Sequence, residues 1–293
     1  MYNTQKIVTM RSSEEIKKII LEKAENDPRI RAVLLNGSRA NSKIAPDRFQ
    51  DFDVVYIVNE IKSFISDHNW IKIFGDILIM QPPDEMIIDN EKKRSLFSYL
   101  MFFKDGNRID LTLFPVDKLE SEYKNDSLTF LLLDKDNLFP NLPPPNDKDY
   151  LIIKPTEKEF ADCCNEFWWV CTYVAKGLCR NEITYAKEMF EIPVRNMFFK
   201  MIEWFIGVEN NFSVSFGKSG KYMKNYLSPG LYEKILFTYP DHKPENIWNS
   251  LFLMTELFSE FANKVSHSLH FNYNKEEENN VKKYLESLHK EQI

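Results

Sequence analysis

The residues best suited to chemistry are two aspartates, Asp51 and Asp53, which follow a Gly-Ser turn at Gly37 and Ser38. One apolar run precedes the turn, and a second, residues 54–58, follows the aspartates. If Asp51 begins a strand, both carboxylates point to the same face and converge. A cation normally offsets such repulsion, and Mg²⁺ is usually held by one or two carboxylates together with substrate phosphates. The pattern predicts metal-assisted nucleotidyl transfer, with the turn offering N–H groups and a hydroxyl to phosphate.

A third aspartate, Asp110, lies in the second half of a predicted hairpin. Two β-prone segments, Phe97–Lys104 and Arg108–Phe114, flank a Gly-containing turn. In the second segment Asp110 shares one face with Arg108 and Thr112, and half-burying a carboxylate there is costly unless it is paired or metal-bound. The sequence therefore predicts that Asp110 is either a third metal ligand or a general base. The alternative is that all three aspartates are ordinary turn, strand-edge and surface acids.

The order Gly-Ser, Asp-x-Asp and a lone strand carboxylate resembles the nucleotidyltransferase superfamily. Longer stretches resemble the aminoglycoside 6-adenylyltransferases, which modify streptomycin. They are LLNGSRAN (34–41), PDRFQDFDVVYIV (46–58), WIKIFGDILIMQPP (70–83), DGNRIDLTLFP (105–115), LLDKD (132–136) and EFADCCNEFWWVCTYVAKGLCRNEI (159–183). The resemblance implies an antibiotic-resistance enzyme that transfers AMP from ATP, with Mg²⁺, to a streptomycin hydroxyl by 6-O-adenylylation and releases pyrophosphate.

We also expect roles for individual residues. The aspartates are the expected catalytic and metal-binding residues, and the expected phosphate ligands are Gly37, Ser38, Arg39, Lys176 and Arg180. Lys176 and Arg180 are i, i+4 neighbours near the end of a predicted helix. The helix dipole alone favours cations at that position, and Arg39 suits a structural ion pair equally well, so these alternatives stay open.

A stripe of acids on the same predicted helix is a candidate acceptor site. Glu159, Asp162 and Glu166 have the spacing of one helical face, which is most often simply solvated. For a substrate with guanidinium groups, carboxylates supply bidentate acceptors and the indole of Trp168 or Trp169 can stack on the planar cation. At least one of the two tryptophans must face away from the stripe.

Composition limits the classes of partner. The 293-residue chain has a net charge of −6 and a pI near 5.6, which argues against nonspecific nucleic-acid binding and suits a polycationic small-molecule substrate. The sequence shows no signal-like or membrane-length apolar segment, so we expect a cytoplasmic protein without a membrane partner. Four cysteines on one predicted helix lack metal or disulfide spacing. The string FGKSGKY (216–222) suggests a P-loop but lacks its first glycine.

The expected fold is α+β in two domains. A nucleotidyltransferase-type mixed sheet with flanking helices is expected over residues 1–135, a Pro- and Asn-rich linker over 136–154, and an α-helical bundle that binds acceptor and nucleotide over 155–293. A capping box predicts a helix from Ser12 to about Asn26. Residues 115–135 and Tyr222–Leu227 are also expected to be helical, and Pro193 is expected to kink a helix over Glu182–Glu209.

Three other functions share these residues. A nucleotidyltransferase with another acceptor, either a different antibiotic or a protein, would differ only in the helical domain. An RNA-tailing enzyme is disfavoured because the chain lacks a basic groove. A non-enzymatic, antitoxin-like binding module is the third alternative, and the intact acidic triad argues against it. The sequence leaves the oligomeric state open.

Overall fold

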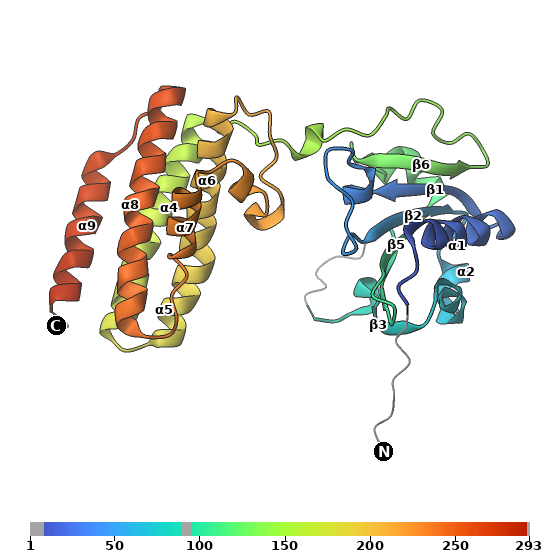
Figure 1. Ribbon diagram of the computed structural model, residues 1–293, viewed down its shortest axis with the longest axis horizontal. Coiled ribbons are helices and arrows are strands. Elements are labelled where there is room, and N and C mark those ends of the chain that lie inside the picture. The colour runs from blue at the N-terminus through green and yellow to red at the C-terminus, as the bar shows by residue number, and fades with distance from the viewer. Residues whose placement is uncertain (1–8, 89–94, 292–293) are drawn as a thin grey trace, which may run out of the picture. The chain divides into compact units, whose positions relative to one another are not determined.

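The computed structural model describes residues 9–88 and 95–291, and the chain divides into two compact units, Met1–Asp149 and Tyr150–Ile293 (Figure 1). No helix in these ranges is both long and apolar enough to cross a membrane. The elements of the first unit are α1 (Ser13–Asn26), β1 (Ile30–Asn36), β2 (Phe52–Val58), α2 (Lys62–Ile65), β3 (Ile77–Gln81), β4 (Phe97–Phe103), β5 (Arg108–Pro115), α3 (Leu119–Glu122) and β6 (Thr129–Asp134).

The strands form one mixed sheet in the order β3-β4-β5-β2-β1-β6. Neighbouring strands are antiparallel except β2 and β5, which are parallel and pair Asp53 with Asp110 in register. Because β2 and β5 run in the same direction, the beginnings of both strands lie at the same edge of the sheet. This pairing places the candidate acids side by side.

The central strands of the sheet are buried on both faces. On one face α1 contributes Ile16, Ile20 and Ala24 to a core shared with alternate residues of the strands, and the Tyr56 hydroxyl donates to the carbonyl of Ile20 at 2.7 Å. The opposite face packs against a smaller cluster around Phe139. The predicted capping box begins α1, since Ser12 and Glu15 exchange hydrogen bonds.

The second unit is helical. Its elements are α4 (Glu157–Cys179), α5 (Ile183–Met189), α6 (Arg195–Glu209), α7 (Pro229–Leu236), α8 (Pro244–Leu269) and α9 (Lys275–Lys290). The long helices α4, α6, α8 and α9 lie side by side around one apolar core (Figure 1). The expected kink at Pro193 is confirmed as a π-helical turn, Phe190–Val194, between α5 and α6, because proline removes an i→i−4 hydrogen bond.

Two sequence expectations were wrong. Only Val116–Lys118 and α3 are helical within residues 115–135, and the rest of that segment includes β6. Its apolar residues pair with the otherwise open edge of β1, a contact that local periodicity does not reveal. In Tyr222–Leu227 only a 3₁₀ turn forms, at Met223–Asn225. The α+β architecture itself is confirmed.

Candidate active site

The three aspartates meet at one edge of the sheet. Asp53 is the second residue of β2, Asp110 is its register partner on β5, and Asp51 comes immediately before β2. Parallel neighbours in a sheet lie about 4.8 Å apart, so the carboxylates of Asp53 and Asp110 share one small volume. The register therefore brings Asp53 and Asp110 together, and Asp51 is near enough for its charge to raise the pKa of Asp53.

Gly37 permits this convergence because it has no side chain. Its φ is +73°, a left-handed conformation, and a Cβ there would lie 2.3 Å from Oδ2 of Asp53. The Asp53 carboxylate thus packs directly over the Gly37 backbone. The Gly37 N–H donates to the carbonyl of Leu128 at 3.0 Å and is therefore already bonded. The hydroxyl of Ser38, the next residue of the turn, has no protein partner among the residues described.

Arg108 supplies the positive charge at this edge. Its Nε and Nη2 each donate to one oxygen of Asp110 at 2.7 Å, and its Nη1 lies 3.6 Å from Oδ2 of Asp51. A bidentate arginine–carboxylate pair is a strong, geometrically specific contact. Arg108 therefore orients Asp110 and partly compensates the acidic cluster.

The cluster nevertheless remains electrostatically unfavourable. Burial, together with the nearby carboxylates of Asp110 and Asp51, raises the pKa of Asp53 to about 6. Burial also raises the pKa of Asp51, although Arg108 and Arg39 oppose this shift. An additional cation at this edge would favour the ionised form of both groups.

The donor set suits a hard divalent cation. Within the described ranges no three His, Cys, Asp or Glu side chains are gathered closely enough to hold a metal ion, and both oxygens of Asp110 contact Arg108. Asp51 and Asp53 offer only carboxylate oxygens, the ligands that Mg²⁺ prefers. Because Asp53 is destabilised as an anion, these residues fit a Mg²⁺ ion, and the metal assignment stays a prediction.

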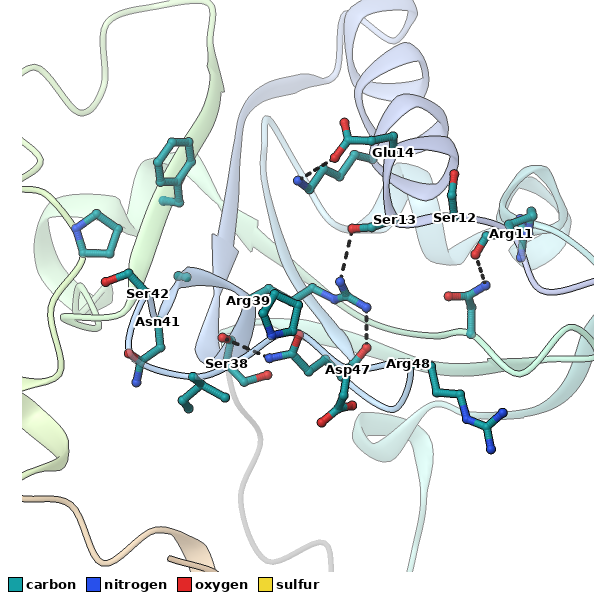
Figure 2. A pocket seen from close by; sticks show the side chains of 18 of the residues that line it. Arg11, Ser12, Ser13, Glu14, Ser38, Arg39, Asn41, Ser42, Asp47 and Arg48 are labelled. Atoms are coloured by element: carbon teal, nitrogen blue, oxygen red, sulfur yellow. Dashed lines mark hydrogen bonds and ion pairs between the residues drawn. The ribbon is translucent and has the colours of Figure 1, made fainter. Parts of the chain in front are cut away.

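Arg39, a predicted phosphate ligand, is bonded to the protein itself. Its Nε donates to the carbonyl of Asp51 at 2.9 Å and its Nη2 to that of Gln50 at 2.6 Å. Its Nη1 donates to the Ser13 hydroxyl at 3.1 Å (Figure 2). The guanidinium also stacks 3.6 Å from the ring of Phe52. These contacts hold the start of β2 against α1. They are made to two carbonyls and a hydroxyl, whereas the structural alternative expected from the sequence was an ion pair, and the role of Arg39 as a phosphate ligand stays a prediction.

A cavity of about 950 Å³ adjoins the Gly-Ser turn (Figure 2). Ser38 and Arg39 line it together with the start of α1 and the segment from Asn41 to Gln50. The three aspartates are not among its lining residues, so the acidic edge and the cavity share only the turn. This places Ser38 where it can contact a ligand that extends from the acids.

The predicted residues of the second unit have different surroundings. Lys176 and Arg180 are exposed at the end of α4, and Arg180 is its C-cap. Trp168 is buried in the helical core and donates from Nε1 to the Tyr273 hydroxyl at 3.2 Å, so its indole faces away from solvent. Trp169 is 58% exposed, which leaves it as the tryptophan that can stack on a ligand.

The acids of the stripe also differ from one another. Glu159 accepts from the N–H and hydroxyl of Thr156 in a capping box at the start of α4, and Asp162 pairs with Lys158. Glu166 is exposed and has no protein partner among the described residues. It precedes Trp169 by three positions and therefore lies on the same side of the helix.

Comparison with known proteins shows the family to which this chain belongs. The family model for streptomycin adenylyltransferase matches residues 10–288. Two aminoglycoside 6-adenylyltransferases are 42% identical (Bacillus subtilis, 96% of this chain and 99% of that protein) and 44% identical (Campylobacter jejuni, 90% and 91%). The chain belongs to the streptomycin adenylyltransferase family. A crystal structure of an aminoglycoside 6-adenyltransferase from Bacillus subtilis, 38% identical, aligns over 96% of this chain and 99% of that one with a TM-score of 0.48.

Family membership confirms the resemblance stated from the sequence. One residue of the site, Arg108, was given no role in the sequence analysis. Arg108 was recognised only as a neighbour of Asp110 on one strand face. The signal was its position two residues before Asp110, which puts both side chains on the same face. Its approach to Asp51 depends on the parallel pairing of β2 and β5, which sequence alone does not give.

Proposed function

We propose that this protein adenylylates streptomycin in the cytoplasm, transferring AMP from ATP to the antibiotic's 6-hydroxyl and releasing pyrophosphate. The observation that carries the proposal is the meeting of Asp51, Asp53 and Asp110 beside a Gly-Ser turn, in a chain of this family. The proposal is supported by relatives whose names describe the same reaction class.

The acidic edge is the proposed reaction centre. Asp51 and Asp53 would hold Mg²⁺, which when bound would offset phosphate charge and make the α-phosphorus more electrophilic. Ser38, whose hydroxyl has no protein partner among the described residues, would donate to the phosphates. Catalysis then consists mainly of positioning and charge stabilisation.

The acceptor hydroxyl must lose a proton as its oxygen attacks phosphorus and the bond to pyrophosphate breaks. Asp110 is the proposed proton acceptor or, alternatively, a third metal ligand. Arg108 donates one hydrogen bond to each carboxylate oxygen of Asp110, and each oxygen keeps a further lone pair. We therefore assign Arg108 the role of fixing the directions of these remaining lone pairs.

On the second unit, Glu166 and Trp169 are the proposed contacts for a guanidinium group of the acceptor. Glu166 offers an exposed carboxylate without a protein partner among the described residues, and Trp169 presents an indole three positions later. The Nε1 of Trp169 donates to the Tyr173 hydroxyl at 2.7 Å, which fixes the ring orientation. Lys176 and Arg180 remain proposed phosphate contacts of this unit.

Glu166→Gln is expected to raise KM for streptomycin about tenfold while KM for ATP stays unchanged, since a charge-assisted hydrogen bond is lost. Asp162→Asn is the matched control, because this acid lies on the same helix but pairs with Lys158. Steady-state kinetics with each substrate varied gives both constants. An unchanged KM for streptomycin in Glu166→Gln, or an equal rise in the control, would contradict the assignment.

The function itself is tested by pyrophosphate release from Mg-ATP with streptomycin, spectinomycin, kanamycin or no acceptor. We expect release with streptomycin only. Release with another acceptor alone would preserve the transferase and reject streptomycin. No release with any of them would favour a protein acceptor or a non-enzymatic binding role.

A further inference from the structure

A glycine- and lysine-rich loop in the helical unit has the backbone of an anion-binding element. Residues 217–221, Gly-Lys-Ser-Gly-Lys, lie between α6 and α7, and Gly217, Ser219 and Gly220 have φ values of 71°, 55° and 73°. A Cβ on Gly217 would meet the Tyr222 ring at 2.6 Å, so this conformation requires glycine there. Ser219 adopts the left-handed region although it is not glycine, a conformation that is uncommon for such a residue.

Two consecutive N–H groups of this loop are free for a ligand. The N–H groups of Gly217, Gly220 and Lys221 donate to Ser215 Oγ and to the carbonyls of Gly217 and Lys218. Those of Lys218 and Ser219 donate to no protein group in the described part of the chain. Successive N–H groups in a turn with left-handed residues form a concavity that binds anions.

The loop also carries positive charge that the protein does not neutralise. The side chains of Lys218 and Lys221 are exposed, and neither forms an ion pair with any residue that the structure describes. The chain as a whole has a net charge of −6, so this loop is a positively charged region on a negatively charged protein. Lysine is a common point-charge partner of phosphate.

A cavity of about 450 Å³ adjoins the loop at Gly217 and Ser219. Arg195, only 6% exposed, lines it and is fixed by Glu191 at 2.5 Å, by Thr238 and by the ring of Tyr239 at 3.7 Å. Lys200 and Glu203 also line it and pair at 2.9 Å, so they largely cancel. Glu191 pairs with both Arg195 and Lys187, so these three side chains together carry one net positive charge. This charge and the two loop lysines make the surroundings of the cavity positive.

We propose that residues 217–221 and the adjoining cavity form a phosphate-binding site in the helical unit. The string is not a P-loop, because no glycine precedes it at the required spacing and no strand leads into it. It retains only the cradle of N–H groups and lysines. The phosphate is that of ATP and pyrophosphate, which rests on the proposed function, or free orthophosphate.

The test uses the full chain without divalent metal. In ¹H–¹⁵N spectra, titration with pyrophosphate should shift the amide signals of Lys218 and Ser219. By calorimetry, the double variant Lys218→Gln, Lys221→Gln should bind pyrophosphate and ATP at least about tenfold more weakly than the wild type. Lys234→Gln is the matched control, since Lys234 is an exposed lysine on α7 outside the loop, and its affinity should stay within about twofold.

The ligand source is resolved by comparing anions. If the loop binds pyrophosphate and ATP more tightly than orthophosphate, its ligand is the phosphate of the nucleotide. If it binds all three equally, its ligand is free phosphate. Unmoved amide signals, or an unchanged affinity in the double variant, would overturn the proposal. A wild type that binds pyrophosphate at the loop yet transfers no AMP would reject only the proposed function.

Discussion

Asp53→Asn is expected to abolish adenylyl transfer and at the same time to stabilise the metal-free protein at neutral pH. The carboxylate is a proposed metal ligand, so its loss should lower the rate of pyrophosphate release by at least about 100-fold. Stability should rise because the anion of Asp53 is unfavourable in the folded state, where burial and two neighbouring carboxylates raise its pKa from 3.8 to about 6. Asparagine keeps the shape without the charge.

The pH dependence has a defined sign. A carboxyl whose pKa is raised on folding costs the wild type stability as pH rises from about 4 to about 6, and asparagine lacks this loss. A shift of about two pKa units corresponds to roughly 3 kcal/mol. The variant should therefore match the wild type below pH 4 and exceed it by about 1–3 kcal/mol above pH 6, because partial solvation reduces the effect.

The measurement is urea unfolding of both proteins at pH 4 and pH 8 with a chelator present, followed by the activity assay with Mg²⁺. Added Mg²⁺ should stabilise the wild type more than the variant. A variant less stable than the wild type at pH 8 would show that Asp53 is not electrostatically strained. Retained activity would remove Asp53 from the reaction centre.

Gly37→Ala is expected to lose activity even though only a methyl group is added. That methyl would lie 2.3 Å from Oδ2 of Asp53, so the carboxylate must leave its present position. The left-handed backbone adds a further cost of about 1–2 kcal/mol. We expect kcat to fall by at least about 100-fold, since small misplacements of reacting groups have effects of this size.

The matched control is Gly106→Ala. Gly106 also has a positive φ, +87°, but its Cβ would meet only Met10 Cε, at 3.9 Å. Both variants should lose similar stability from backbone strain, and only Gly37→Ala should lose kcat in steady-state assays. Equal activity in the two variants would show that the contact between Gly37 and Asp53 does not position the acid.

Local sequence signals predicted much of this fold. The capping box of α1 and the Gly-containing turn between β4 and β5 depend on residues close in the chain, and both are present. The strand β6 was missed because its partner, β1, lies about a hundred residues earlier, and only that pairing decides between helix and strand. Long-range pairing is the information that local patterns lack.

The same distinction applies to the site. The convergence of Asp51 and Asp53 followed from the two-residue period of a strand. The contact of Arg108 with Asp51 required the register of β2 against β5, and the hydrogen bonds of Arg39 required the placement of α1 beside the start of β2. Burial of Trp168 rather than Trp169 depends on the packing of α4 against α8 and α9.

The most direct measurement is mass spectrometry of streptomycin after incubation with ATP, Mg²⁺ and either wild-type protein or Asp53→Asn. We expect the wild type to increase the mass of the antibiotic by one AMP group, located at the 6-hydroxyl by NMR, and the variant to leave the mass unchanged. Unmodified streptomycin with the wild type, in samples that bind ATP, would contradict the proposed function.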